Sequence, residues 1–169
     1  MDRIGNAIRE TGGIDAVIGF SQGAAAAAMV ASLLQPGRAA SFSTQQPGSF
    51  PFPKSWEDLA ALHPDGLKFA VSYSGFLTSN KLYEGFYEPK INSPTLHFIG
   101  SLDSVVEESR SLALVEACHD AKTVFHPGGH FVPVGKEMGG ILVGFIRECT
   151  KEKAEAKDEA GVEEMDMPF

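Results

Sequence analysis

A serine, an aspartate and a histidine that could act together in nucleophilic catalysis occur in order along this chain. Ser21 lies in the sequence GFSQG at residues 19–23, between an apolar strand pattern and an alanine-rich helix pattern. This G-x-S-x-G pattern, with a strand before it and a helix after it, is typical of a sharp turn that lifts a serine hydroxyl clear of a sheet. Small residues two positions either side of the serine let strand and helix pass closely. Serine alone is a weak nucleophile, so the hypothesis requires a base and a group that orients it.

The chain contains both groups in the order serine, acid, histidine that an α/β-hydrolase requires. Asp103 follows a buried strand pattern at residues 94–100, and His130 lies in a glycine-rich loop after a second strand pattern at residues 123–126. Catalytic groups of open parallel sheets gather beyond the carboxyl ends of the strands, so we expect the three side chains to meet there. Asp103 could also be the N-cap of the helix that follows it.

The order of the residues assigns a role to each of them. Ser21 is predicted to be the nucleophile and His130 the general base and then the general acid, while Asp103 holds the imidazole tautomer and stabilises the imidazolium. The backbone N–H of Gln22 is expected to donate to an oxyanion, because it follows the nucleophile at the helix N-terminus.

The other four histidines are weaker candidates for the base. His97 and His126 fall within strand patterns and are interpreted as core or interface residues, His119 lies in a helix-to-strand turn, and His63 lies in a loop. Of the five, His130 alone combines the required chain order with a loop at the carboxyl end of a strand.

Alternating strand and helix patterns predict the elements that position these residues. We expect strands at residues 14–19, 69–74, 95–99 and 123–126, and helices near residues 2–11, 22–34, 105–118 and 134–150. Such alternation is typical of a parallel sheet flanked by helices, so the predicted fold class is α/β.

Four blocks of sequence in order resemble the FSH family of serine hydrolases. They are GFSQGA at 19–24, YSGF at 73–76, PTLHFIGSLD at 94–103 and HPGGHFVP at 126–133, and the resemblance covers about residues 4–147. The family includes carboxylesterases related to the ovarian-cancer-associated hydrolase and fungal esterases or thioesterases of polyketide pathways. The resemblance implies an α/β-hydrolase fold and Ser21, Asp103 and His130 as the catalytic residues. It also implies hydrolysis of an ester or thioester through an acyl-enzyme, with no metal or organic cofactor.

The chain departs from the family pattern before the serine. Family members carry a longer stretch there, with a His-Gly loop that supplies a second oxyanion donor, whereas here only 20 residues precede Ser21. We therefore expect the C-terminal half of the hydrolase sheet, N-terminally incomplete, with the flank of strand 14–19 exposed. The hydrolase domain is predicted at residues 1–150.

Residues 36–66 interrupt the alternation of strands and helices. The segment contains five prolines together with Ser, Gly and Gln, and long connections of this kind are often lids or surface loops. As a lid, it would contact an acyl group through its aromatic residues; as a surface loop, those residues would anchor it. Phe76, which follows the second strand, is a candidate substrate-binding residue, with packing at the sheet rim as the alternative.

The composition excludes some classes of partner but does not indicate a reaction. The net charge is −8, basic residues do not cluster, and no apolar run approaches the ~20 residues that span a bilayer, so we expect no nucleic-acid partner and no membrane span. Two cysteines form no disulfide framework, which favours a reduced, cytoplasmic setting. From Lys151 onward the chain has three lysines and seven acidic residues; this tail could extend the last helix, and we predict that residues 151–169 are disordered.

Two functions of different classes follow from the sequence. The first is a serine hydrolase that cleaves a carboxylic ester or thioester of a small molecule. The second is a catalytically impaired, truncated hydrolase that acts as a non-enzymatic binding protein. Both predict the same residues.

Overall fold

A computed structural model describes residues 1–43 and 47–163, with residues 152–163 described by their backbone alone. The chain divides into two compact units, Met1–Pro133 and Val134–Phe169. The candidate residues all belong to the first unit.

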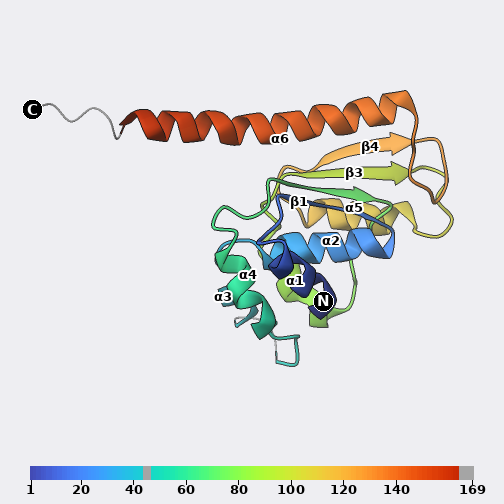
Figure 1. Ribbon diagram of the computed structural model, residues 1–169. Helices are drawn as coiled ribbons and strands as arrows, with labels where there is room; N and C mark the ends of the chain where they lie inside the picture. Colours follow the sequence, from blue (N-terminus) through green and yellow to red (C-terminus); the bar gives the residue numbers. More distant parts are fainter. Residues whose placement is uncertain (44–46, 164–169) are drawn as a thin grey trace, which may run out of the picture. The chain divides into compact units, whose positions relative to one another are not determined.

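The first unit is built on a parallel sheet of four strands in sequential order (Figure 1). The strands are β1 (Ala16–Phe20), β2 (Phe69–Tyr73), β3 (Thr95–Gly100) and β4 (Lys122–His126). Every residue of β2 and β3 is buried, because both strands have a neighbour on each side. β1 is an edge strand, as expected for strand 14–19. Its Ile18 and Phe20 are exposed.

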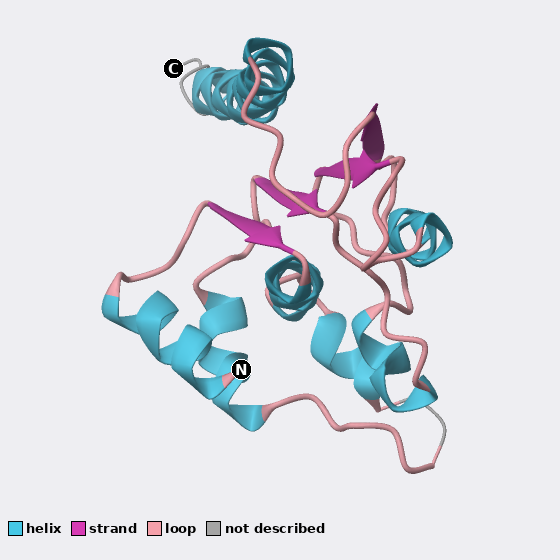
Figure 2. Cartoon of the chain, turned by 90° about the vertical axis from the view of Figure 1, so that its right-hand side faces the viewer, coloured by secondary structure: helices cyan, strands magenta, loops and turns pink. Residues whose placement is uncertain are grey.

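Helices α2 and α5 lie on one side of this sheet (Figure 2). α2 (Gln22–Leu33) begins directly after the candidate serine and packs on β1 and β2, and α5 (Glu108–Glu116) contacts β3. Five consecutive alanines make the first half of α2 narrow, which lets it lie close to the strands. The helix is buried on nearly all sides, which fits its apolar composition. α1 (Asp2–Glu10) precedes β1 and ends at a glycine pair.

The described part of residues 36–66 contains short helices rather than an open loop. They are α3 (Arg38–Phe42), the 3-10 helix η1 (Lys54–Trp56) and α4 (Glu57–Ala61). Figure 1 shows α3 and α4 toward the end of the sheet opposite the arrowheads. The candidate residues follow the arrowheads, so this arrangement favours the surface excursion over the lid. Residues 44–46 lie outside the described residues.

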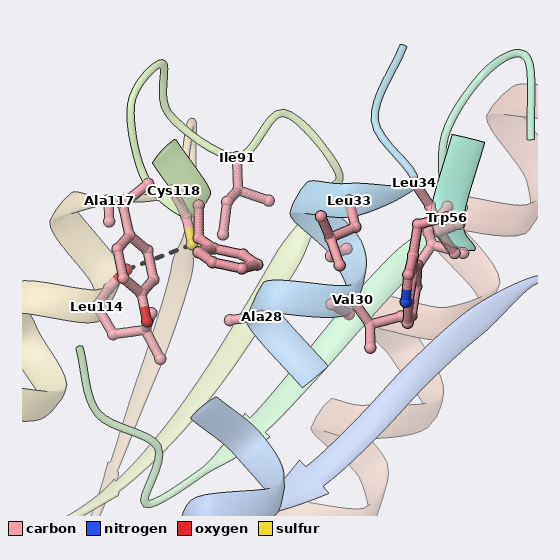
Figure 3. Close-up of a cluster of buried hydrophobic side chains, with 14 of the residues drawn as sticks. Ala28, Val30, Leu33, Leu34, Trp56, Ile91, Leu114, Ala117 and Cys118 are labelled. Carbon is pink, nitrogen blue, oxygen red and sulfur yellow. Dashed lines mark hydrogen bonds between the residues drawn. The ribbon is translucent and has the colours of Figure 1, made fainter. Parts of the chain in front are cut away.

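Two aromatic residues of that segment, Phe42 and Trp56, are buried in the main hydrophobic core, whereas Phe50 is exposed. Trp56 is fully buried in a cluster with Val30 and Leu33 from the second half of α2 and with Leu34, the C-cap of that helix (Figure 3). Leu59 of α4 is fully buried in the same cluster. A second 3-10 helix, η2 (Lys81–Phe86), adds Phe86, whose ring meets that of Phe42 edge to face with centroids 5.0 Å apart. The core therefore fixes the far end of α2 and leaves its N-terminus at the carboxyl edge of the sheet.

The second unit contains the long helix α6 (Lys136–Glu163). The helix begins close to the predicted position and continues past residue 150, as in the extended-helix alternative for the tail. The disorder of residues 151–169 stays a prediction, and residues 164–169 lie outside the described residues. Along the described residues, no helix is both long enough and apolar enough to cross a membrane.

The predicted fold class is confirmed: the chain forms a parallel α/β sheet with flanking helices. The four strands lie within two residues of their predicted bounds at either end. The helix predicted from residue 105 starts at Glu108 instead, because Val105 and Val106 form a turn on the side chain of Asp103.

Candidate active site

Ser21 occupies a strained turn between β1 and α2. Its backbone has φ 55° and ψ −122°, a conformation that L side chains rarely adopt, and its N–H donates to the Tyr73 carbonyl at 2.8 Å. A Cβ at position 19 would lie 2.2 Å from the carbonyl oxygen of Gly23, so the turn requires glycine at position 19. A Cβ at Gly23 would meet no atom within 4 Å, so this structure explains one flanking glycine and not the other.

A second close approach brings the loops after β3 and β4 together. A Cβ at Gly100, the last residue of β3, would lie 2.6 Å from the carbonyl oxygens of Gly128 and Gly129. The N–H of Leu102 donates to the Gly128 carbonyl at 3.0 Å, which ties the two loops together. Asp103 lies in the first loop and His130 in the second.

The structure brings the three predicted side chains into one chain of hydrogen bonds. The Asp103 carboxylate can only accept, so His130 donates Nδ1–H to Asp103 Oδ2 at 2.8 Å. In this tautomer Nε2 is an acceptor, and the Ser21 hydroxyl lies 2.9 Å from it, oriented to donate. The side chain of Asp103 is 3% exposed and that of His130 is 17% exposed. The carboxylate is therefore shielded from solvent, while Ser21 is half-buried.

Hydrogen-bond donors hold the Asp103 carboxylate in its charged form. Burial alone would raise its pKa, but the N–H groups of Val106 and Val105, the His130 ring and the Ser74 hydroxyl together lower that pKa to about 2. Both backbone N–H groups donate to Oδ1 at 2.9 Å. The capping interpretation was thus half right: Asp103 caps a turn, while the N-cap of α5 is Glu107.

Exposed apolar residues lie beside these three residues, in space or along the sequence. The ring of Phe20 lies 4.8 Å from the imidazole of His130, centroid to centroid. Four further exposed residues flank the aspartate and the histidine in sequence: Leu102, Val105, Phe131 and Val132. An apolar rim around a polar centre is the surface that a hydrophobic ligand group prefers.

The two remaining predicted site residues are also at this edge. Gln22 is the first residue of α2, so its N–H points out of the helix N-terminus next to Ser21. Phe76 is half-buried after β2, and the Arg110 guanidinium lies 4.3 Å from the centre of its ring. Contact of Phe76 with a substrate stays a prediction.

The other histidines lie where they cannot reach Ser21. His63 is buried, donating from Nδ1 to the Leu59 carbonyl at 2.7 Å and accepting the Ile14 N–H on Nε2 at 3.0 Å. His126 is buried on β4, and His119 is exposed beside Asp120.

His97 has a distinct environment inside the sheet. Burial lowers its pKa to about 4, so it is neutral at physiological pH. With Ser72 and Cys118, it lines a small cavity between α2 and the strands. The volume that the centre of a water-sized sphere can occupy in this cavity is about 10 Å³. His97 is thus a core residue, as its position on a strand suggested.

Sequence analysis missed one residue at this edge, Ser74. It follows β2 as Ser21 follows β1, with φ 48°, and its side chain is buried. Among the described residues, Ser21, Ser74 and Asp120 are the non-glycine residues with positive φ. The YSGF block at residues 73–76 was the available signal, but nothing in it indicates a strained serine.

Comparison with known proteins identifies the family. A family model described as "Serine hydrolase (FSH1)" matches residues 1–140. The chain belongs to this family. The resemblance deduced from the four sequence blocks is therefore confirmed.

The relatives are longer than this chain. The Family of serine hydrolases 3 protein of Saccharomyces cerevisiae is 32% identical over 168 residues, 96% of this chain and 56% of that protein. Esterase OVCA2 of Danio rerio is 32% identical over 149 residues, 87% of this chain and 55% of that protein. A Schizosaccharomyces pombe protein named dihydrofolate reductase is 38% identical over 133 residues, 79% of this chain and 25% of that protein. The chain thus spans between a quarter and just over half of these relatives.

Solved structures support the fold. The crystal structure of Zea mays acyl-protein thioesterase 2 superposes with a TM-score of 0.54 at 20% identity, over 88% of this chain and 62% of that one. At this identity the likeness establishes the α/β-hydrolase fold alone.

Proposed function

We propose that this protein is a serine hydrolase that cleaves a carboxylic ester or thioester of a small molecule through an acyl-enzyme. The observation that carries the proposal is the hydrogen-bonded series Ser21, His130 and Asp103, with distances of 2.9 and 2.8 Å. Membership of a serine hydrolase family and relatives named esterases support the same reaction class.

In the first half of the proposed reaction, the serine becomes acylated. Ser21 Oγ attacks the acyl carbonyl carbon as His130 Nε2 takes its proton, and Asp103 stabilises the resulting imidazolium. The oxygen that gains negative charge is stabilised by the N–H of Gln22 and by the N-terminus of the 12-residue helix α2. His130 then returns the proton to the leaving alcohol or thiol as its bond to the acyl carbon breaks.

In the second half, water replaces the leaving group. His130 takes a proton from water, the hydroxide attacks the acyl carbon, and the acid leaves as Ser21 recovers its proton. The sum is ester or thioester plus water to acid plus alcohol or thiol, so no oxidant or reductant is needed.

The proposal is tested by reacting the folded, monodisperse protein with p-nitrophenyl butyrate and with butyryl-coenzyme A. We expect a burst of about one p-nitrophenol per chain, with a matching butyryl adduct by intact mass, and neither in Ser21→Ala. Comparing the two substrates decides between ester and thioester. Failure of the wild type both to form an adduct and to turn over either substrate would favour the non-enzymatic binding protein.

A further inference from the structure

The buried serine after β2 has two features that each cost free energy. Ser74 adopts φ 48°, and its side chain is 1% exposed, yet its hydroxyl forms no hydrogen bond of standard geometry with the described residues. A strained backbone and a buried hydroxyl without a good partner are both unfavourable. Their coincidence at one residue next to the candidate site calls for a functional explanation.

The position of Ser74 in the sheet points to its partner. Its N–H donates to the Phe98 carbonyl on β3 at 2.9 Å, so the residue lies beside the strand that leads to Asp103. The hydroxyl is close enough to the Asp103 carboxylate to contribute to its lowered pKa. The described donors to that carboxylate are Val105 and Val106 on Oδ1 and His130 on Oδ2.

We propose that Ser74 is a positioning residue whose hydroxyl donates to the Asp103 carboxylate and thereby fixes the oxygen that His130 binds. Rotation about the Cα–Cβ bond moves the hydroxyl oxygen toward the carboxylate, and the proton then turns freely about the Cβ–Oγ bond to suit its acceptor. On this basis the backbone strain at Ser74 is tolerated because the residue supplies a donor to the carboxylate. The inference rests on the proposed function, since it assigns Asp103 the role of orienting His130.

The experiment compares Ser74→Gly and Ser74→Ala with wild type and with Ser32→Ala. Glycine tolerates φ 48° without strain, so Ser74→Gly removes the hydroxyl without endangering the fold. Ser32 is a matched control on α2, because its hydroxyl is also buried and without a hydrogen-bond partner among the described residues.

Two readouts are measured on each variant. The first is titration of the Asp103 carboxyl carbon by NMR, where loss of a donor to the charged form raises the pKa by about one unit. The second is the rate of labelling by a fluorophosphonate probe, which falls about tenfold, the kinetic equivalent of one charge-assisted hydrogen bond. Both changes are expected in Ser74→Gly and in Ser74→Ala, and neither in Ser32→Ala.

An unchanged Asp103 titration in the folded Ser74→Gly variant would overturn the inference. A role in backbone strain alone predicts that Ser74→Ala, which keeps the strain, labels as fast as wild type while Ser74→Gly, which relieves it, labels at a different rate, and this result would also overturn it. If the carboxyl titrates at higher pH in both variants but wild type is never labelled, the positioning contact is supported and the proposed hydrolase function fails.

Discussion

Two serine–histidine pairs in the described part of the chain differ in how they are arranged. Ser21 and His130 are hydrogen-bonded at the carboxyl edge of the sheet, where Asp103 holds the imidazole. Ser72 and His97 are cross-strand neighbours inside the sheet, yet the Ser72 hydroxyl and His97 Nε2 have no hydrogen-bond partner among the described residues.

The difference between the pairs is the environment, since the residue types are the same. Asp103 holds one imidazole in the tautomer whose Nε2 faces the serine hydroxyl, as a general base requires. The other imidazole is surrounded by alanines and strand side chains, where burial lowers its pKa to about 4. A serine–histidine pair thus becomes a candidate catalyst through its third partner and its access to ligands.

The largest expected effect comes from replacing one histidine or the other. His130→Ala removes the base and should lower the rate of ester hydrolysis by about 10⁵-fold, in the range seen when serine hydrolases lose this group. His97→Leu should leave the rate within about threefold, because nothing connects that ring to the reaction. Steady-state kinetics on both variants measures the contrast. Equal losses in two folded variants would contradict the comparison between the pairs.

The next largest effect is on the turn that presents Ser21. Gly19→Ala forces a Cβ to within 2.2 Å of a backbone oxygen, so we expect it to lower the free energy of unfolding by more than about 3 kcal/mol. Gly23→Ala is the control, because its Cβ meets open space. Urea denaturation of the two variants measures the difference. Similar midpoints would show that strand and helix have more room than the structure gives them.

A smaller expected effect is on the pH dependence of stability, to which His97 and Asp103 contribute over different pH intervals. The unfolded chain binds a proton at His97 below about pH 6.5, while the native chain does not until about pH 4, so stability falls as pH is lowered through this interval. The loss is roughly 3 kcal/mol at most. The pKa of Asp103 is lowered to about 2, so its contribution is present at pH 4 and is lost only at lower pH.

Denaturation at pH 7, 5 and 4 tests this separation of the two intervals. His97→Leu should flatten the dependence of the free energy of unfolding on pH between pH 6.5 and 4. A variant with the same slope as wild type would assign the acid sensitivity to another group.

The sequence predicted the parts of the site that depend on chain order and strand ends. Ser21, Asp103 and His130 could be selected because a parallel sheet collects its carboxyl ends at one edge. His97 could be set aside because it falls inside a strand pattern. The close packing of Gly100 against the loop at Gly128 and Gly129 could not be predicted from the sequence, since contact between two loops leaves no periodic pattern.

The parts that depend on tertiary packing could not be predicted. Trp56 and Phe42 lie in a proline-rich segment without helical periodicity, and their burial arises from contact with α2 and η2. The positive φ of Ser74 has no sequence signal either, because serine usually avoids that conformation.

The most direct test of the account locates the reactive serine. The full chain is treated with a fluorophosphonate probe at neutral pH, and the modified peptide is identified by mass spectrometry. We expect one adduct per chain, on Ser21, absent in Ser21→Ala and unaffected in Ser72→Ala. An adduct on another serine, or none on the folded wild-type protein, would contradict the claim that the pair at the sheet edge is the catalytic one.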